Sequence, residues 1–493
     1  MHTRDRPGTG GTLRHVSVPP VFFRCVLSAD FRILAFKEID IMANHDFNIN
    51  RRRFIKGAAA SLALTSFGAY GLDIIYPEKA YRVALIGSGW YGKSDLFRLI
   101  QVSPVDVVGI SDVDANMLKG AAELVAKRQK SGKKPPVFGD YKKMLAETKP
   151  DIVLIGSPDH WHALQAIDAI EAGAHVYLQK PISVDVMEGE AILAAARKHN
   201  RVVQIGTQRR STPHLIDAKK NIVEAGLLGK ISHVELCCYF PMRSNSKLSE
   251  QPVPDFFDYE NWTGPAPMRP FTGLPHRRWR QFMEYGNGIV GDMCVHMLDA
   301  ARWTLGLGWP KRITSTGGIY VQKEGDANIS DTQTALFEFD ELTCIWQHRT
   351  WGTSADPQYP WSYKFYGEKG TLSCSTMQYD FVPVDRNAQK IHKDVVYERE
   401  QYPEDETEEG IEMNAAPATR RQMLDFLGAI QERRRPVADV EEGHISTASC
   451  ILANLSMELE RPLVYDHAKR EVKGDAEATA RLKREYRKGW QHP

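Results

Sequence analysis

One segment of the sequence places two carboxylates and an imidazole at helical spacing. In Gly286-Asn-Gly-Ile-Val-Gly-Asp292-Met-Cys-Val-His296-Met-Leu-Asp299, glycines precede a predicted helix on which Asp292, His296 and Asp299 share one face. Flanking carboxylates set the tautomer of an imidazole and raise its basicity, so His296 is a candidate proton acceptor. A core histidine satisfied by Asp299 is the structural alternative. Asp-x-x-x-His is also half of a metal site, but no matching ligand pair occurs elsewhere, so we expect no metal.

Lys180 stands where another predicted element ends. Residues 175–179 (His-Val-Tyr-Leu-Gln) predict a short strand that closes on Lys180-Pro181. Pro181 favours an extended conformation at Lys180 and stops the strand there. An ammonium fixed at a strand end can donate to a hydroxyl and favour its alkoxide, although most lysines serve only on the surface. Lys180 is therefore a second acid–base candidate.

A glycine-rich turn predicts a dinucleotide site. Residues 81–86 predict a buried strand, and Gly87, Ser88, Gly89, Trp90, Tyr91 and Gly92 then complete G-x-G-x-x-G before an amphipathic helix. In this pattern the first glycine permits the turn, the second lets the backbone approach a pyrophosphate and the third packs helix on strand. The helix N-terminus offers N–H groups to the phosphates. A glycine turn without a ligand is the alternative.

Asp112 indicates which dinucleotide is bound. It ends a second apolar run, twenty residues beyond Gly92, where an acidic side chain meets the ribose 2′-hydroxyl. A carboxylate there repels a 2′-phosphate, so NAD is favoured, while Lys119 leaves NADP open. A turn or helix-cap aspartate is the alternative.

Ligands of doubly wound sheets lie outside the carboxyl ends of the strands. On the cofactor side we therefore expect Ser157, Pro158, His162, Gln179 and Lys180. On the substrate side we expect Gln208 and Arg209, which follow the last strand of the first domain, and Asp299. Trp262 and Arg278 lie in or just after the Pro-rich segment 252–275, which predicts an ordered loop over a cleft. Each of these has a purely structural alternative.

Two domains are predicted to position these residues. Residues 78–206 alternate short apolar strands with helices, which predicts a parallel, doubly wound Rossmann sheet. In residues 207–493 the strand patterns 231–240, 312–321, 332–339, 342–350 and 362–367 follow one another with few helices between them. They predict an open, mostly antiparallel sheet with one face free for a partner subunit, giving an α/β domain followed by an α+β domain.

Composition sets the class of protein. The 493 residues are 42% hydrophobic and 25% charged, with a formal net charge of +1. This is an ordinary globular profile, and the near-zero charge argues against nucleic-acid binding. Seven cysteines without a C-x-x-C pair suggest neither a disulfide framework nor a zinc site.

The N-terminal region predicts export. Asn50-Arg-Arg-Arg-Phe-Ile-Lys56 matches the twin-arginine pattern, and residues 57–71 are too short and too weakly apolar to span a membrane comfortably. A basic surface helix is the alternative. Residues 42–75 are thus predicted to be the signal region, with Met42 as the true start and residues 1–41 a non-native extension. We expect a periplasmic or otherwise exported protein that retains its nucleotide tightly.

Together the motifs resemble the Gfo/Idh/MocA family, which includes glucose–fructose oxidoreductase and inositol dehydrogenase, over about residues 80–490. The matching pieces are 87–92, 158–162, 171–176 with Lys180-Pro181, and 291–299. In that family the lysine of Glu-Lys-Pro and an Asp-x-x-x-His pair are catalytic, which the resemblance carries to Lys180, Asp292 and His296. Gln179 departs from the pattern, because the family usually has Glu there.

The resemblance implies an oxidoreductase that moves hydride between NAD and a sugar or polyol. Lys180 would polarise the reacting hydroxyl, His296 would take its proton and Asp292 would orient the pair. Two alternatives stay open: a glycoside-cleaving enzyme of the same family that oxidises its substrate transiently, and a non-catalytic sugar-binding Rossmann protein. We also expect a homo-oligomer formed through the open sheet.

Overall fold

The first sheet is parallel, and its central strands are buried on both faces. The computed structural model describes residues 80–273, 278–408 and 410–493, which lie in one unit. The strand order β3-β2-β1-β4-β5-β6 reverses direction between β1 and β4, which is the place where doubly wound sheets bind ligands. The strands are β1 (Tyr81–Ile86), β2 (Val105–Ser111), β3 (Val137–Phe138), β4 (Ile152–Ile155), β5 (His175–Leu178) and β6 (Val203–Ile205).

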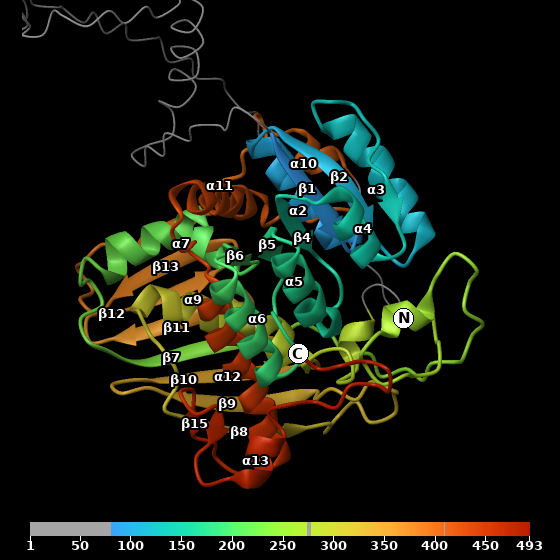
Figure 1. Cartoon of the computed structure of the whole chain (residues 1–493). Coiled ribbons are helices and arrows are strands. Elements are labelled where there is room, and N and C mark those ends of the chain that lie inside the picture. The colour runs from blue at the N-terminus through green and yellow to red at the C-terminus, as the bar shows by residue number, and fades with distance from the viewer. Residues whose placement is uncertain (1–79, 274–277, 409) are drawn as a thin grey trace, which may run out of the picture. The chain divides into compact units, whose positions relative to one another are not determined.

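Helices cover both faces of this sheet (Figure 1). Asp114, Asp140 and Asp185 each accept a backbone N–H at the first turn of the helix that follows, so the side chains fix where α3, α4 and α6 begin. The helices are α2 (Trp90–Val102), α3 (Ala115–Arg128), α4 (Tyr141–Thr148), α5 (His162–Glu171) and α6 (Val186–Lys198).

The second sheet has the order β14-β13-β12-β11-β7-β10-β9-β8. Its strands pair antiparallel except for β7 with β10, which are parallel. Burial alternates along them: in β9, Gln333, Ala335 and Phe337 are buried and their neighbours are not. The strands are β7 (Ile231–Cys238), β8 (Arg312–Gly318), β9 (Thr332–Glu338), β10 (Thr343–Arg349), β11 (Trp361–Gly367), β12 (Gly370–Ser375), β13 (Gln378–Pro383) and β14 (Ile391–Asp394).

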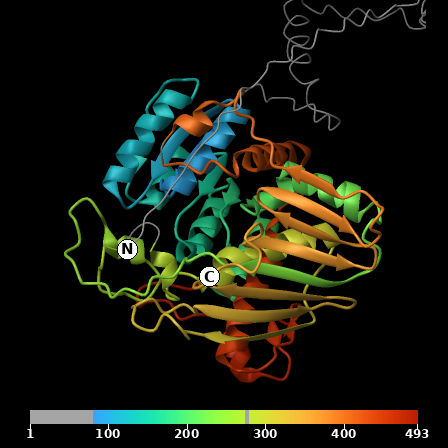
Figure 2. The same ribbon diagram turned by 180° about the vertical axis from the view of Figure 1, so that it is seen from behind.

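One face of this sheet packs on helices and the other is open. The buried face contacts α9 (Val295–Leu305) and α12 (Val440–Glu458). Figure 2 shows the opposite face, with the strands lying in front of the helices. Partly exposed Trp351, Met377 and Val382 belong to this sheet or its adjoining turns.

The remaining elements are short, and several of them carry candidate site residues. They are η1 (Asp159–Trp161), η2 (Gln208–Ser211), α7 (Pro213–Ala218), η3 (Lys219–Val223), α8 (Tyr259–Thr263), η4 (Trp279–Gln281), η5 (Val290–Cys294), α10 (Glu404–Thr407), β15 (Tyr465–Asp466), β16 (Glu471–Val472) and α13 (Ala476–Ala480).

The second half of the chain also completes the core of the first domain. Helix α11 (Ala416–Glu432) packs against α2, and Met423, Phe426 and Leu427 join the cluster formed by β1, β2 and α2. The ring of Phe426 lies 6.1 Å from that of Tyr177 in β5. The two halves therefore share one of their apolar cores.

The fold class predicted from the sequence is confirmed. Strands β12, β13 and β14 were not predicted, because β12 is rich in small polar residues and most of β14 is exposed at the sheet edge. The twin-arginine signal and residues 1–41 lie outside the described residues and stay predictions. Among the helices that are described, none has the length and apolar character that a membrane crossing needs.

Candidate active site

The glycine turn has the geometry of a phosphate-binding loop. Gly87 has φ +83°, and a Cβ there would lie 2.5 Å from the Ser157 backbone nitrogen. A Cβ on Gly92 would lie 2.0 Å from the Gly87 carbonyl oxygen, so both positions need glycine. At Gly89 a Cβ would meet nothing within 4 Å, so that backbone faces open space. No side chain caps α2, which leaves the first N–H groups of the helix facing this space.

Asp112 braces the loop from the end of β2. Its carboxylate accepts hydrogen bonds from the Ser88 N–H at 2.7 Å, the Ser88 hydroxyl at 2.9 Å and the Asp114 N–H at 3.0 Å. Burial raises the pKa of Asp112, and the bonds from Ser88 and Asp114 oppose that shift. The helix-cap role belongs to Asp114, which accepts the N–H groups of Asn116 and Met117.

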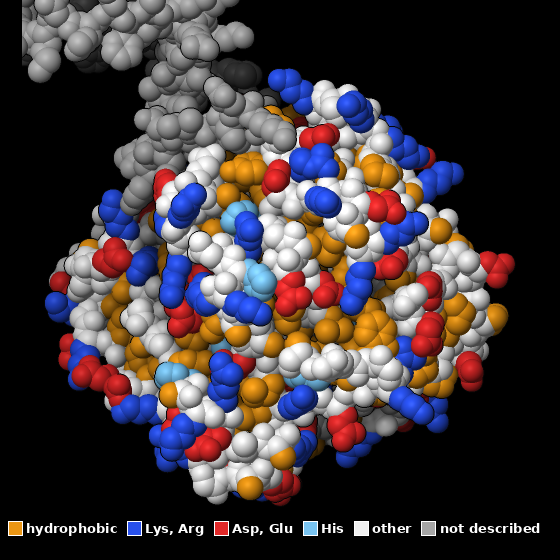
Figure 3. Space-filling view, viewed as in Figure 1, with side chains coloured by type: hydrophobic (Ala, Val, Ile, Leu, Met, Phe, Trp, Pro, Cys, Tyr) orange, Lys and Arg blue, Asp and Glu red, His pale blue; other side chains and the backbone are white. Residues whose placement is uncertain are grey.

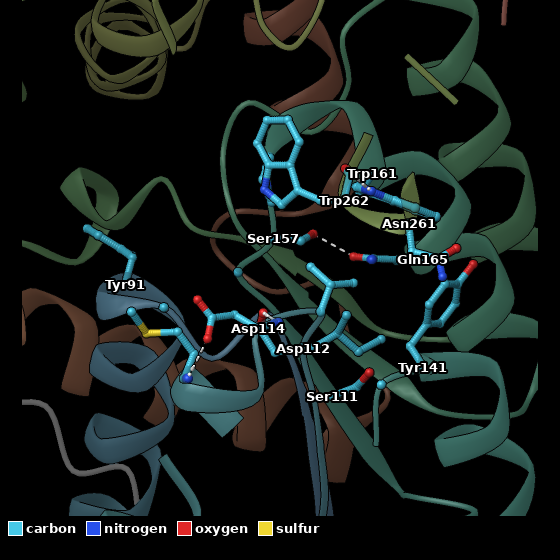
Figure 4. Close-up of a pocket in the computed structure, with 18 of the residues that line it drawn as sticks. Tyr91, Ser111, Asp112, Asp114, Tyr141, Ser157, Trp161, Gln165, Asn261 and Trp262 are labelled. Atoms are coloured by element: carbon cyan, nitrogen blue, oxygen red, sulfur yellow. Dashed lines mark hydrogen bonds between the residues drawn. The ribbon is translucent and has the colours of Figure 1, made fainter. Parts of the chain in front are cut away.

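A cavity of about 650 Å³ opens at the carboxyl ends of β1, β2 and β4. Figure 4 shows Asp112, Tyr141, Ser157 and Trp262 around it, with the Ser157 hydroxyl donating to Gln165 at 2.5 Å. Lining residues that the sequence predicted are Gly87, Gly89, Trp90, Tyr91, Asp112, Ser157, Pro158 and Trp262. This volume lies in the range of small-molecule and cofactor sites.

Two residues expected at the cofactor hold the surrounding loops instead. The ring of His162 lies between the carbonyl oxygens of Pro181 and Ser157, at 2.7 and 2.9 Å, and burial lowers its pKa to about 4. Gln179 donates to the Asp95 carboxylate at 2.6 Å. Both side chains are buried and neither lines the cavity, because short loops behind the strand ends need these polar partners.

Lys180 and Asp292 form a buried pair. The ammonium donates to the Asp292 carboxylate at 2.6 Å and to its backbone carbonyl at 2.8 Å. The guanidinium of Arg280, which lines the cavity, lies 3.4 Å from the same carboxylate. Burial opposes ionisation of Asp292, yet Lys180 and Arg280 together hold its pKa below the ordinary value. Asp292 is therefore ionised, and Arg280 connects the pair to the cavity.

His296 follows Asp292 along the same helical segment, formed by η5 and α9. No carboxylate of the described residues bonds to its Nδ1. Its ring packs edge-on against Trp361, with centroids 5.4 Å apart, and Nδ1 is buried without a partner among the described residues. Burial, followed by the charges of Lys180 and Arg209, lowers the pKa of His296 well below its ordinary value. The imidazole is therefore neutral at pH 7, as a proton acceptor must be.

The expectation that Asp299 flanks His296 and raises its basicity was wrong. Asp299 is fully buried in a bidentate ion pair with Arg210, at 2.8 and 2.9 Å, and accepts from the Ser446 hydroxyl. Residues Val290–Cys294 form a π-helical turn, whose wider spacing breaks the single face that a regular helix gives to 292, 296 and 299. The contacts of Asp299 are thus with Arg210 and Ser446 and not with His296.

The expected substrate residues separate into two groups. Gln208 donates to the Tyr91 hydroxyl, and the Arg209 guanidinium lies over the Trp361 ring, 5.3 Å from its centroid. Arg209 and His296 thus both contact the ring of Trp361. Trp262 is buried in an aromatic cluster, and its carbonyl accepts from the Trp161 indole at 2.8 Å. Arg278 is exposed, because η4 turns Arg280 rather than Arg278 toward the site.

Sequence reasoning missed Arg280 and Trp490. Arg280 is two positions beyond the predicted Arg278, so only the local turn decides between them. Trp490 lines the cavity and packs edge-on against Trp161, with centroids 5.0 Å apart. No sequence signal marks it, since the segment 483–493 returns to the cavity through tertiary contacts alone.

Two family models match the chain. Residues 81–207 match the Gfo/Idh/MocA model of the oxidoreductase family, NAD-binding Rossmann fold, and residues 220–464 match its companion model, the C-terminal alpha/beta domain of the same family.

Individual proteins are similar over different spans. A glycosyl hydrolase family 109 protein of Akkermansia muciniphila is 29% identical over 178 residues, 34% of this chain and 36% of that protein. An uncharacterized oxidoreductase of Bacillus subtilis, YrbE, is 28% identical over 222 residues, which are 45% of this chain and 53% of that protein. The chain thus matches about a third to a half of these relatives' length. The solved structure of a levoglucosan dehydrogenase with NADH and levoglucosan matches in fold, with TM-score 0.59 and 17% identity over 78% of this chain and 99% of that one.

Proposed function

Because the chain belongs to the Gfo/Idh/MocA oxidoreductase family, with an NAD-binding Rossmann domain, we propose that it oxidises or reduces a sugar or polyol hydroxyl with a retained NAD. The observation that carries the proposal is the link through Arg280. This side chain lines the dinucleotide cavity and also contacts Asp292, the partner of Lys180. The acid–base pair therefore lies at the cavity, where a reacting carbon would meet the nicotinamide.

The residues present fit NAD. Gly89 leaves the backbone open for a pyrophosphate, the uncapped start of α2 faces it, and Asp112 lies at the cavity wall where a ribose hydroxyl would bond. When bound, NAD would accept the hydride of a hydroxyl substrate or donate one to a carbonyl substrate, so in repeated turnover a second, carbonyl-bearing sugar would take the hydride back from the retained nucleotide. The carboxylate of Asp112 disfavours the extra phosphate of NADP.

The chain's own groups supply positioning and proton transfer. Two of the three ammonium donors of Lys180 bond to Asp292, so one remains for a substrate oxygen. Asp292 stays ionised and holds Lys180 in place. The neutral imidazole of His296 accepts the hydroxyl proton as the carbonyl forms. General acid–base groups of this kind contribute about 10²- to 10⁴-fold in rate.

The open sheet suits pairing of two subunits. Val382 in β13 is 44% exposed, and Trp351 and Met377, in turns that adjoin the sheet, are 37% and 41% exposed. We expect the enzyme to be a homo-oligomer through this sheet, and sedimentation equilibrium measures its mass directly. We also retain the proposal of export through the twin-arginine route, which rests on residues 50–56 alone.

Glycosidic cleavage is a second candidate function. The relative from Akkermansia muciniphila carries the name of a glycosyl hydrolase family, although it matches only 34% of this chain. Transient oxidation by bound NAD would use the same cavity and the same Lys180–His296 groups. This reaction cleaves a glycoside without net change of the nucleotide, whereas the leading function yields a keto-sugar or reduces one.

The test begins with protein purified without added nucleotide. Denaturation should release about one NAD per chain, identified by mass spectrometry. Neutral and acidic sugars, polyols and glycosides are then offered while nicotinamide absorbance and products are followed. The proposal predicts conversion that Lys180→Ala abolishes and that the exposed control Arg386→Gln leaves intact. Equal conversion by Lys180→Ala, or the absence of bound nucleotide, would contradict it.

A further inference from the structure

Arg209 is a buried cation without a counter-ion. Its side chain belongs to a residue only 7% exposed, its Nε has no hydrogen-bond partner, and its guanidinium makes no ion pair with a carboxylate of the described residues. The adjacent Arg210 differs: it holds Asp299 with two bonds and Glu442 with a third. Two neighbouring arginines at the end of β6 thus have opposite environments, one satisfied and one free.

The free guanidinium lies at the proton-transfer groups. It packs on one side of Trp361, at 5.3 Å from the ring centroid, while His296 packs on the ring at 5.4 Å. The carboxylate of Glu412 acts on Arg209 only at longer range, because it accepts the N–H groups of Asn414 and Ala415. Arg209 does not line the dinucleotide cavity, so the pyrophosphate does not reach it there.

The charges around the site leave a positive surplus. Lys180 and Arg280 share one carboxylate, that of Asp292. A second carboxyl nearby, Asp159, has its pKa raised by burial to about 7 and is only partly ionised near neutral pH. A buried guanidinium stays protonated, and a buried charge without a partner costs free energy that a bound anion offsets.

We propose that the substrate is an acidic sugar, whose carboxylate, phosphate or sulfate group binds the guanidinium of Arg209 while its reacting hydroxyl lies at Lys180 and His296. The inference rests on the proposed function and narrows its substrate class. A guanidinium binds planar or tetrahedral oxyanions through two parallel N–H donors, which fixes the sugar in one orientation as well as attracting it.

The experiment compares matched sugars on the holoenzyme. Glucose, glucuronate and the phosphate and sulfate esters of glucose at the same carbon are tested, with the galactose series beside them. Turnover and product are measured for the native chain, Arg209→Gln, Arg209→Lys and the control Arg386→Gln. We expect kcat/KM for one acidic series to exceed that for the neutral sugar about 10- to 100-fold, the range for a hydrogen-bonded charge. Arg209→Gln should remove this preference through KM, and Arg209→Lys should keep part of it.

Each outcome decides a different question. The acidic sugar with the highest kcat/KM shows whether the bound anion is a carboxylate, a phosphate or a sulfate. Neutral sugars turned over as well as acidic ones would overturn the inference and leave the proposed function standing. Loss of bound nucleotide in Arg209→Gln with unchanged preference would assign Arg209 to the cofactor and overturn it as well. A chain that converts no sugar of either kind would refute the proposed function and, with it, the inference.

Discussion

At the scale of residues, proton transfer depends on Lys180 and His296, which their surroundings control in different ways. Lys180 is fixed by the Asp292 carboxylate, and His296 is kept neutral by burial and by nearby cations. We predict that Lys180→Ala and His296→Ala each lower kcat about 10²-fold or more. Because both act on one proton transfer, the double variant should be little slower than the slower single one. Nucleotide content, measured on each variant, should stay unchanged, and near-normal turnover by His296→Ala would remove it from the mechanism.

Cofactor choice is a separate residue-scale property. Asp112 lines the cavity and bonds to Ser88 and Asp114 rather than to the proton-transfer groups, so Asp112→Asn should weaken discrimination against NADP more than it lowers kcat. Reconstitution of stripped protein with each nucleotide measures the ratio of affinities. The matched control is Asp114→Asn, which alters the cap of α3 and should leave the ratio unchanged. An unaltered ratio in Asp112→Asn would make that carboxylate a brace for Ser88 only.

Some residue roles could be predicted from the sequence and others could not. The glycine turn and Asp112 lie at the ends of β1 and β2, where the pattern predicted them, because strand, turn and helix are contiguous there. The family resemblance assigned Lys180 and Asp292 to one site. Their spacing did not predict the 2.6 Å contact, because the two residues are 112 positions apart in the chain. Asp299 and Arg278 were misplaced because a π-turn and a short 3₁₀ turn change which side chains face the site.

At the scale of elements, the segment 483–493 forms one wall of the cavity. Arg487 anchors it through its backbone N–H, which donates to the Pro265 carbonyl at 2.8 Å, and Trp490 then packs on Trp161. Removal of that ring should open the wall, so we predict that Trp490→Ala releases NAD about tenfold faster. Nucleotide loss during dialysis measures this, with the exposed Tyr320→Ala as control. Release at the native rate would show that the wall does not retain NAD.

The contact between the segment 483–493 and the start of α6 should weaken as pH rises. His492 lies 2.8 Å from the Asp185 carboxylate, and that bond outweighs burial and raises the pKa of His492. The contact is thus present below the ordinary histidine pKa of about 6.5 and is lost as pH rises through the raised value. Burial and the charge of Asp185 raise the pKa of Glu188 to about 8, so its ionisation also disfavours the folded segment as pH rises.

Exchange of the Arg484 amide, which donates to Asp185 at 3.0 Å, reports on this segment. We expect its protection to fall as pH rises above about 6.5, and to fall less in His492→Gln. Protection that increases over this range would contradict the assignment. These contacts join residues about three hundred positions apart in the chain. The sequence therefore indicated the helices and strands, but not that the segment 483–493 binds the start of α6.

For the whole molecule, two domains share cores and surround one cavity. Hydrophobic periodicity predicted both sheets, yet it could not show that α11 returns to cover the first sheet, because an amphipathic helix does not specify its partner. Charged side chains of both signs alternate over the face drawn in Figure 3, in keeping with the near-zero net charge. The unpaired charge lies inside the molecule, at Arg209, where we propose that it binds an acidic substrate group.

The central claim is direct hydride transfer between a sugar carbon and retained NAD. Holoenzyme whose bound nucleotide is oxidised is incubated with a hydroxyl substrate of the panel that carries deuterium on every carbon, and the nucleotide is released and analysed by mass spectrometry. The account predicts one deuterium on the nicotinamide in the native chain and none in Lys180→Ala. Conversion of the sugar with no deuterium on the nucleotide would contradict it.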